Sequence, residues 1–189
     1  MWAEVVAGRT DIKITYEHYC ALPEGPPRYQ LIEGELEMSP SPNFRHQDIV
    51  GNIYAELRAF VRKRRLGKVC VSPVDVILDD DNVFQPDVLF ISASRKHIIA
   101  PEGVRGAPDL CVEILSPSNR NLDLETKRVV YARHGVIEYW IVDPENDSVT
   151  IYRLQENPRA PLRVLKNSET LSSDLMPGFT MDVAAVFAE

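Results

Sequence analysis

Residues 110–115 have the sequence LCVEIL, in which Glu113 is the single charged residue. A short apolar run of this length is typical of a strand that is buried on both faces of a sheet. A carboxylate in such a strand is costly unless a cation or a metal ion meets it. We therefore expect a central strand here, with Glu113 in a structural salt bridge or in a functional site.

Apolar runs on both sides of this segment predict the rest of a mixed sheet. The expected strands cover 68–78, 87–92, 109–115, 136–142 and 148–154. Helical spacing predicts helices over 15–22, 44–66 and 122–133, with Gly67 capping the second. Residues 29–38 alternate around Glu33-Gly34 and predict a hairpin, while 93–107 are expected to form a long loop. This order predicts an α/β (α+β) fold, in one domain over residues 1–189, with helices on the faces of the sheet.

The composition excludes several classes of protein. The 189 residues carry a net charge of −7, which argues against a protein held to nucleic acid by charge alone but leaves room for a local basic groove. The three cysteines and four histidines show no spacing typical of zinc or disulfide sites. No apolar run is long enough to span a membrane, and Met1 to Tyr19 contain no signal-peptide core. We expect a soluble, cytoplasmic protein.

Two further charged residues stand in apolar surroundings. Asp87 follows Pro86 and opens the run 88–91; its alternative role is that of a turn residue. Lys127 shares a helix face with Leu124 and Tyr131, at spacings of three and four residues, and is expected to point inward. The alternative for Lys127 is a weak surface pair with Asp123.

Carboxylates without a histidine or thiol partner form an oxygen-only site, which suits Mg²⁺ or Mn²⁺. Such an ion polarises a phosphoryl oxygen and lowers the pKa of bound water. A neighbouring lysine can orient that water or stabilise charge on phosphorus. Asp87, Glu113 and Lys127 together indicate phosphodiester hydrolysis.

Pro86-Asp87, followed 26 residues later by Glu113, resembles the PD-(D/E)XK nuclease motif. The longer stretch 107–118 (APDLCVEILSPS), then Asp123, Lys127 and Tyr131, then 135–144 (GVIEYWIVDP), is similar to the Uma-two family of restriction endonucleases. The similarity extends from 29–36 (YQLIEGEL) through His46 to 175–179 (LMPGF).

The resemblance implies a restriction-endonuclease-like core, a mixed four-stranded sheet flanked by helices, with extra N- and C-terminal strands. It implies Asp87 and Glu113 as metal ligands. Leu115 occupies the position at which the motif has a lysine. The resemblance implies that in this family the lysine lies on the following helix instead, at the position of Lys127.

Glu35 and His46 match positions that recur near the site in the family. Glu35 is the candidate for a further metal ligand. A histidine one turn into a helix is more often a satisfied polar residue, which is the alternative for His46. Asp75, in another apolar run, is a reserve ligand.

The resemblance implies a Mg²⁺-dependent DNA endonuclease, acting as a homodimer by analogy with nucleases that cut both strands. The alternative is a catalytically silent nuclease fold that acts as a binding or assembly module. Residues 62–65 (RKRR) most simply form a solvated helix end, although they could contact phosphate, as could Arg95, Lys96 and Arg105.

Overall fold

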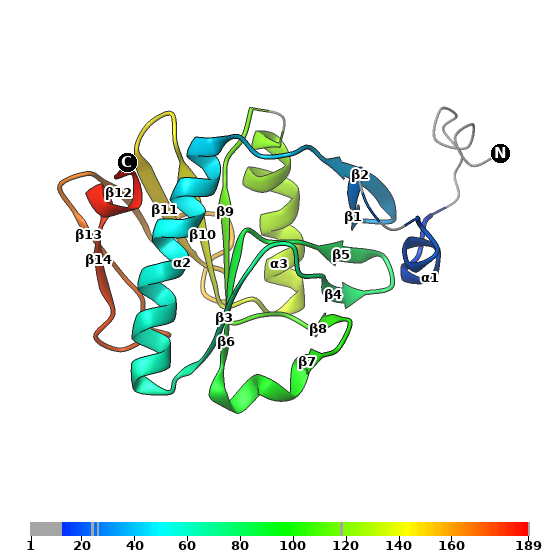
Figure 1. The fold of residues 1–189 in the computed structure, drawn as a ribbon, viewed down its shortest axis with the longest axis horizontal. Coiled ribbons are helices and arrows are strands. Elements are labelled where there is room, and N and C mark those ends of the chain that lie inside the picture. The colour runs from blue at the N-terminus through cyan, green and yellow to red at the C-terminus, as the bar shows by residue number, and fades with distance from the viewer. Residues whose placement is uncertain (1–12, 24, 26, 118, 189) are drawn as a thin grey trace.

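The computed structural model describes residues 13–188 except residues 24, 26 and 118 (Figure 1). Residues 1–12, on which part of the signal-peptide expectation rests, lie outside the described residues. The helices are α1 (Tyr16–Cys20), α2 (Phe44–Arg64), the 3₁₀ helix η2 (Ala93–Ile98), the π-helix η3 (Leu122–Lys127), α3 (Arg128–His134) and α4 (Val183–Val186). The strands are β1 (Arg28–Ile32), β2 (Glu35–Ser39), β3 (Gly67–Val71), β4 (Val76–Asp79), β5 (Asn82–Phe84), β6 (Val88–Ser92), β7 (Ile99–Ala100), β8 (Gly103–Arg105), β9 (Leu110–Ile114), β10 (Glu138–Asp143), β11 (Ser148–Arg153), β12 (Arg163–Lys166), β13 (Thr170–Ser172) and β14 (Thr180–Asp182).

The central sheet is mixed, as predicted. Its strand order is β12-β11-β10-β9-β6-β3. β9 and β10 are parallel, and the other neighbours are antiparallel. A parallel pair needs a crossover connection, which η3 and α3 supply. This crossover carries Lys127 across the face of the sheet.

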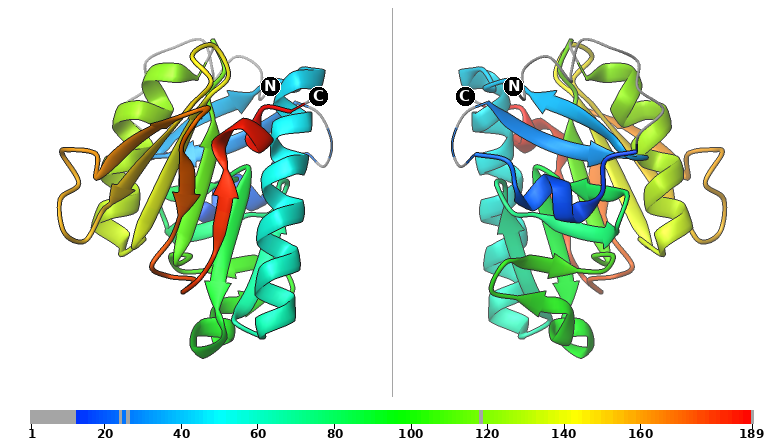
Figure 2. Two further views of the ribbon diagram at one scale, coloured as in Figure 1. Left: turned by 90° about the vertical axis from the view of Figure 1, so that its left-hand side faces the viewer. Right: turned by 90° about the vertical axis from the view of Figure 1, so that its right-hand side faces the viewer.

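The two long helical segments cover opposite faces of the central sheet (Figure 2). Side chains alternate along β9, so that Leu110, Val112 and Ile114 pack into the core beneath α2. Cys111 packs into the core beneath α3. Glu113 has the same parity as Cys111, and the strand therefore directs its carboxylate toward the crossover helix.

The C-terminal cap of α2 differs from the sequence prediction, which gave it to Gly67. Arg65 adopts the left-handed conformation (φ 58°) and ends the helix, with its N–H bonded to the carbonyls of Arg62 and Val61. Gly67 instead begins β3, where an added Cβ would lie 2.0 Å from the carbonyl oxygen of Ile91. The glycine is needed because strands β3 and β6 approach each other closely at this position, not because the helix ends there.

Residues 68–78 form two strands rather than the one predicted. Pro73, which has no N–H to donate to a ladder, lies between β3 and β4. β4 joins a second sheet of order β2-β1-β5-β4-β8-β7. The predicted hairpin is present as β1–β2 and belongs to this second sheet, so it does not extend the central one. Residues 93–107, expected as a loop, contain η2, β7 and β8.

At the C-terminal end, β12 extends the central sheet and β13 pairs with β14. Side chains of α4 join the core beneath α2. Among the described residues, none of the helices has the length and apolar character that a membrane crossing requires.

Candidate active site

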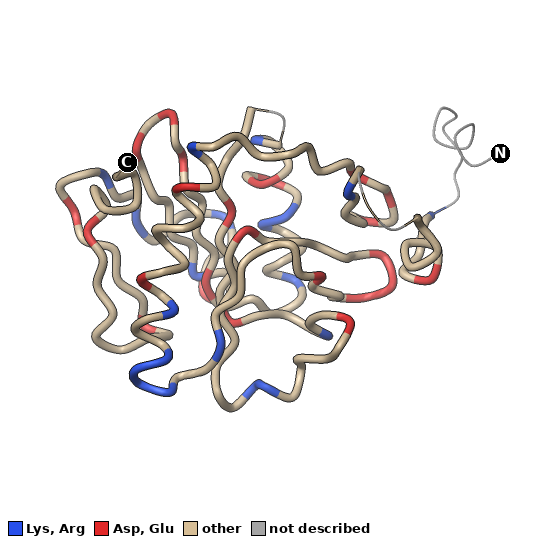
Figure 3. Tube along the Cα trace, in the orientation of Figure 1, with Lys and Arg blue, Asp and Glu red and all other residues tan. Residues whose placement is uncertain are grey.

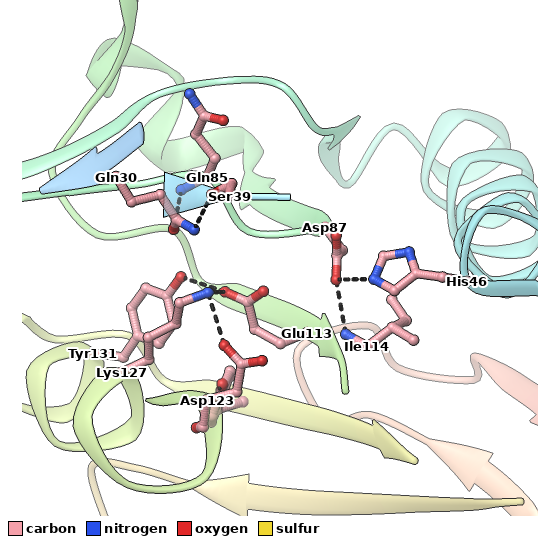
Figure 4. A network of polar contacts seen from close by, with 11 residues as sticks. Gln30, Ser39, His46, Gln85, Asp87, Glu113, Ile114, Asp123, Lys127 and Tyr131 are labelled. Atoms are coloured by element: carbon pink, nitrogen blue, oxygen red, sulfur yellow. Dashed lines mark hydrogen bonds and ion pairs between the residues drawn. The ribbon is translucent and has the colours of Figure 1, made fainter. Parts of the chain in front are cut away.

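A buried charged cluster links β9 to the crossover helix. Glu113, Asp123 and Lys127 are only 3%, 3% and 2% exposed. Lys127 Nζ donates to Glu113 Oε1 at 3.0 Å and lies 2.8 Å from Asp123 Oδ1, an ion pair without hydrogen-bond geometry. The Tyr131 hydroxyl also donates to Glu113 Oε1, at 3.0 Å (Figure 4). Lys127 therefore points inward, as its helix position predicts.

The π-helical turn of η3 positions this cluster. Asp123 and Lys127 are four residues apart, and the wider turn places both side chains against the sheet. The Tyr139 hydroxyl of β10 donates to the backbone carbonyl of Asp123 at 3.0 Å. Short π-helical segments occur frequently at functional sites. The alternative for Lys127 was a surface pair with Asp123; the pair is present, but it is buried.

Asp87 lies at the end of the neighbouring strand and is held from two sides. Its Oδ2 accepts the N–H of Ile114 at 2.8 Å and lies 3.3 Å from His46 Nε2 (Figure 4). The side chains of Asp87 and His46 are 16% and 13% exposed. His46 is placed in the first turn of α2, which begins where the Asn43 side chain accepts the His46 N–H at 2.8 Å. The structure thus brings His46 to the predicted site.

Asp87 and Glu113 occupy the same end of the sheet. The antiparallel ladder pairs Val88 with Val112, and Asp87 and Glu113 are the next residues beyond this pair on the two segments. The charge of Asp87 contributes to the raised pKa of Glu113, so the two carboxylates lie close enough to repel each other.

The carboxylates of this site outnumber its buried lysine, and the pKa shifts reflect that excess. Burial raises the pKa of Glu113 to about 8, because the lowering effect of Lys127 does not offset burial together with the charges of Asp123 and Asp87. Burial likewise raises the pKa of Asp123. Burial alone would lower the pKa of Lys127, but Asp123 and Glu113 raise it above its ordinary value, so the ammonium stays charged.

A similar balance acts on the imidazole. Burial alone would lower the pKa of His46, but its contact with Asp87 raises it overall. Nδ1 of the same ring is buried and has no hydrogen-bond partner among the described residues. His46 therefore serves Asp87 through Nε2 alone.

Two predicted residues are not brought to this cluster. Glu35 is exposed at the start of β2, opposite Ile32, and no hydrogen bond or ion pair within the described chain joins it to the site. Its role as a ligand stays a prediction from the resemblance. Asp75 lies before β4, where its Oδ1 accepts from the Tyr19 hydroxyl at 3.1 Å and from Gln85 Nε2 at 2.8 Å. Asp75 has neutral partners of its own there, and its reserve role stays a prediction.

The donor chemistry fits a hard divalent cation. In the described part of the chain, no three His, Cys, Asp or Glu side chains are already arranged as a metal centre. Asp87 Oδ1 and Glu113 Oε2 nevertheless take part in none of the contacts described above, and both are carboxylate oxygens at the same end of the sheet. Oxygen donors in an excess of negative charge suit Mg²⁺ or Mn²⁺.

The raised carboxyl pKa predicts how stability depends on pH. In EDTA, the folded protein should bind more protons than the unfolded chain between about pH 5 and 8, so the free energy of unfolding should fall as pH rises. Glu113→Gln removes the group and should flatten this decline by on the order of 2 kcal/mol. Urea unfolding at several pH values measures it, with Glu35→Gln as the exposed control. A loss of several kcal/mol in Glu113→Gln at pH 8 would contradict the prediction and make Glu113 structural.

Comparisons with known proteins identify the family of the chain and a solved structure with the same fold. The Uma2 family model, described as "Putative restriction endonuclease", matches residues 16–184. No curated protein matches the chain. A crystal structure described as "a putative nuclease belonging to DUF820" from Anabaena variabilis superimposes with a TM-score of 0.78, at 22% identity, over 92% of this chain and 97% of that one. This likeness confirms the predicted fold. Since the family model spans nearly all of the described residues, the chain belongs to the Uma2 family.

Proposed function

We propose that the protein is a Mg²⁺- or Mn²⁺-dependent endonuclease that hydrolyses phosphodiester bonds of DNA. Its family model is described as "Putative restriction endonuclease", which supports nuclease chemistry. The observation that carries the proposal is the buried Glu113–Lys127–Asp123 cluster beside Asp87, at one end of a mixed sheet. A purely structural salt bridge needs one carboxylate for one ammonium. This site holds three carboxylates, those of Glu113, Asp123 and Asp87, for the single ammonium of Lys127.

Asp87 and Glu113 would hold the ion through the oxygens that Lys127, His46 and the backbone leave free. The bound cation would supply Lewis-acid polarisation of the phosphodiester and an acidified water. Lys127 keeps its positive charge and offers it to charge that develops on phosphorus. Tyr131 and His46 orient Glu113 and Asp87 by holding one oxygen of each.

The dimer is proposed by analogy alone. A symmetric pair of such sites would let one assembly cut both strands of a duplex.

Nicking of supercoiled plasmid tests the proposed function. The wild-type protein should relax the plasmid in Mg²⁺ or Mn²⁺ and not in EDTA. Glu113→Gln should lower the nicking rate by on the order of 10²-fold or more, the scale for losing one preorganised charge. This variant keeps the acceptor for Lys127 and Tyr131, so it should remain folded.

An intact plasmid with the wild-type protein and either ion would overturn the hydrolytic proposal. The alternative of a silent nuclease fold would then be favoured, because Lys127 already holds one oxygen of both Glu113 and Asp123. Equal nicking rates for Glu113→Gln and the wild type would remove Glu113 from the machinery.

A further inference from the structure

A basic cleft lies at the opposite end of α2 from His46. Its volume is about 530 Å³, and its charged lining consists of Arg58, Arg62, Arg65, Lys68 and Lys96, with no carboxylate. All five side chains are exposed. Figure 3 shows basic residues gathered at this lower end of the molecule. Such a cluster of positive charge stands out in a protein whose net charge is −7.

The consecutive elements α2 and β3, together with the more distant η2, build the basic cleft. Arg58 and Arg62 are four residues apart and share one face of the last turns of α2. Arg65 turns the chain into β3, whose second residue is Lys68. Lys96 comes from η2, which is tied to the same turn where the Ala93 N–H donates to the carbonyl of Leu66 at 2.7 Å.

The charges of the basic cleft are not neutralised within the described chain. None of its five side chains forms an ion pair there. Within the described residues, Arg58 contacts the neutral Tyr54, through its hydroxyl and through its ring face. By contrast, Arg95 is paired with Asp109 at 3.2 Å, and Arg105 with Glu102.

The helix dipole accounts for only part of this pattern. Cations in the last turn of a helix are favourable on their own, which explains Arg62. Lys68 and Lys96 lie outside the helix and gain nothing from its dipole. Mutual repulsion makes their convergence unfavourable unless an anion occupies the basic cleft.

The position of the basic cleft points to a long polyanion. Arg62 follows His46 by 16 residues in α2, which corresponds to about 24 Å along the helix axis. That is too far for the basic cleft to touch a phosphodiester held at Asp87. Duplex DNA advances about 3.4 Å per base pair, so the separation spans about seven base pairs.

We propose that the basic cleft binds the phosphate backbone of duplex DNA about seven base pairs from the bond to be cut. This inference rests on the proposed function for its ligand. Clustered unpaired cations supply sequence-independent affinity, and a contact remote from the reacting bond favours long substrates over short ones.

Binding without divalent ions tests the basic cleft separately from hydrolysis. A labelled duplex of 24 base pairs is titrated in EDTA at increasing KCl, with fluorescence anisotropy as the readout. Arg62→Gln/Lys68→Gln should bind about tenfold more weakly at low salt, with a slope of log affinity against log salt lower by about two. Arg159→Gln/Lys166→Gln, which removes two exposed charges elsewhere, is the matched control and should bind like the wild type.

Each outcome decides one of the two proposals. If Arg62→Gln/Lys68→Gln binds with the same affinity and salt slope as the control variant, the proposal that the basic cleft binds DNA is overturned, even if the wild type nicks plasmid. If binding depends on the basic cleft but the wild type nicks no plasmid, the proposed DNA contact is supported and the proposed hydrolytic function is overturned. Full displacement of the duplex by inorganic phosphate at equal phosphate concentration would overturn the DNA assignment in favour of a small-anion site.

Discussion

Lys127→Met should lower the free energy of unfolding by about 3–5 kcal/mol at pH 8, the cost of breaking a buried ion pair. Met fills nearly the volume of the lysine stem but leaves Glu113 and Asp123 without their cation in a dry environment. The loss should shrink at pH 5, because the carboxyls can then become neutral. Urea unfolding at the two pH values measures both effects.

A second substitution makes this prediction sharper. Adding Asp123→Asn to Lys127→Met should restore part of the lost stability, since the remaining Glu113 is then no longer repelled by Asp123. Lys166→Met, on an exposed side chain, is the matched control and should stay within about 0.5 kcal/mol of the wild type. A cost below about 1 kcal/mol for Lys127→Met would mean that water reaches the cluster and that its burial has no energetic consequence.

Asp87→Asn should reduce plasmid nicking by on the order of 10²–10³-fold. Asparagine retains an oxygen that can accept the Ile114 N–H, so the local structure should survive. What it loses is the negative charge that would hold the cation beside Glu113. Divalent-ion binding, followed by calorimetry, should weaken together with the nicking rate.

Asp75→Asn is the matched control for this loss. Its carboxylate also lies next to an apolar strand, but its partners are the neutral Tyr19 and Gln85. Nicking by Asp75→Asn should stay within a few-fold of the wild type. An Asp87→Asn protein that nicks as fast as this control would exclude Asp87 from the site.

Burial of a carboxylate alone does not identify a site in this fold. Glu138 of β10 is 3% exposed, yet its oxygens accept from the neutral Trp140 Nε1 at 2.6 Å and Ser173 Oγ at 2.9 Å. It thereby ties the C-terminal segment to the central sheet. Glu113 differs because further charged groups converge on it.

The sequence alone determined the central elements and the residues that stand out in them. The apolar run around Glu113 and the helical spacing of 122–133 predict β9 and the crossover helix. Both follow from local periodicity, which a single chain segment expresses in full. The inward position of Lys127 was predictable for the same reason, since it follows from helix geometry.

Tertiary contacts decided the rest. Whether Asp123 pairs with Lys127 in water or in the core depends on the sheet that packs over η3. The local sequence of η3 does not show that this sheet will pack there. The place of Asp75 and the convergence of Arg62, Lys68 and Lys96 likewise depend on which distant segments meet. Burial and charge proximity are properties of three-dimensional packing, so the same carboxylate or lysine has a different energy in each setting.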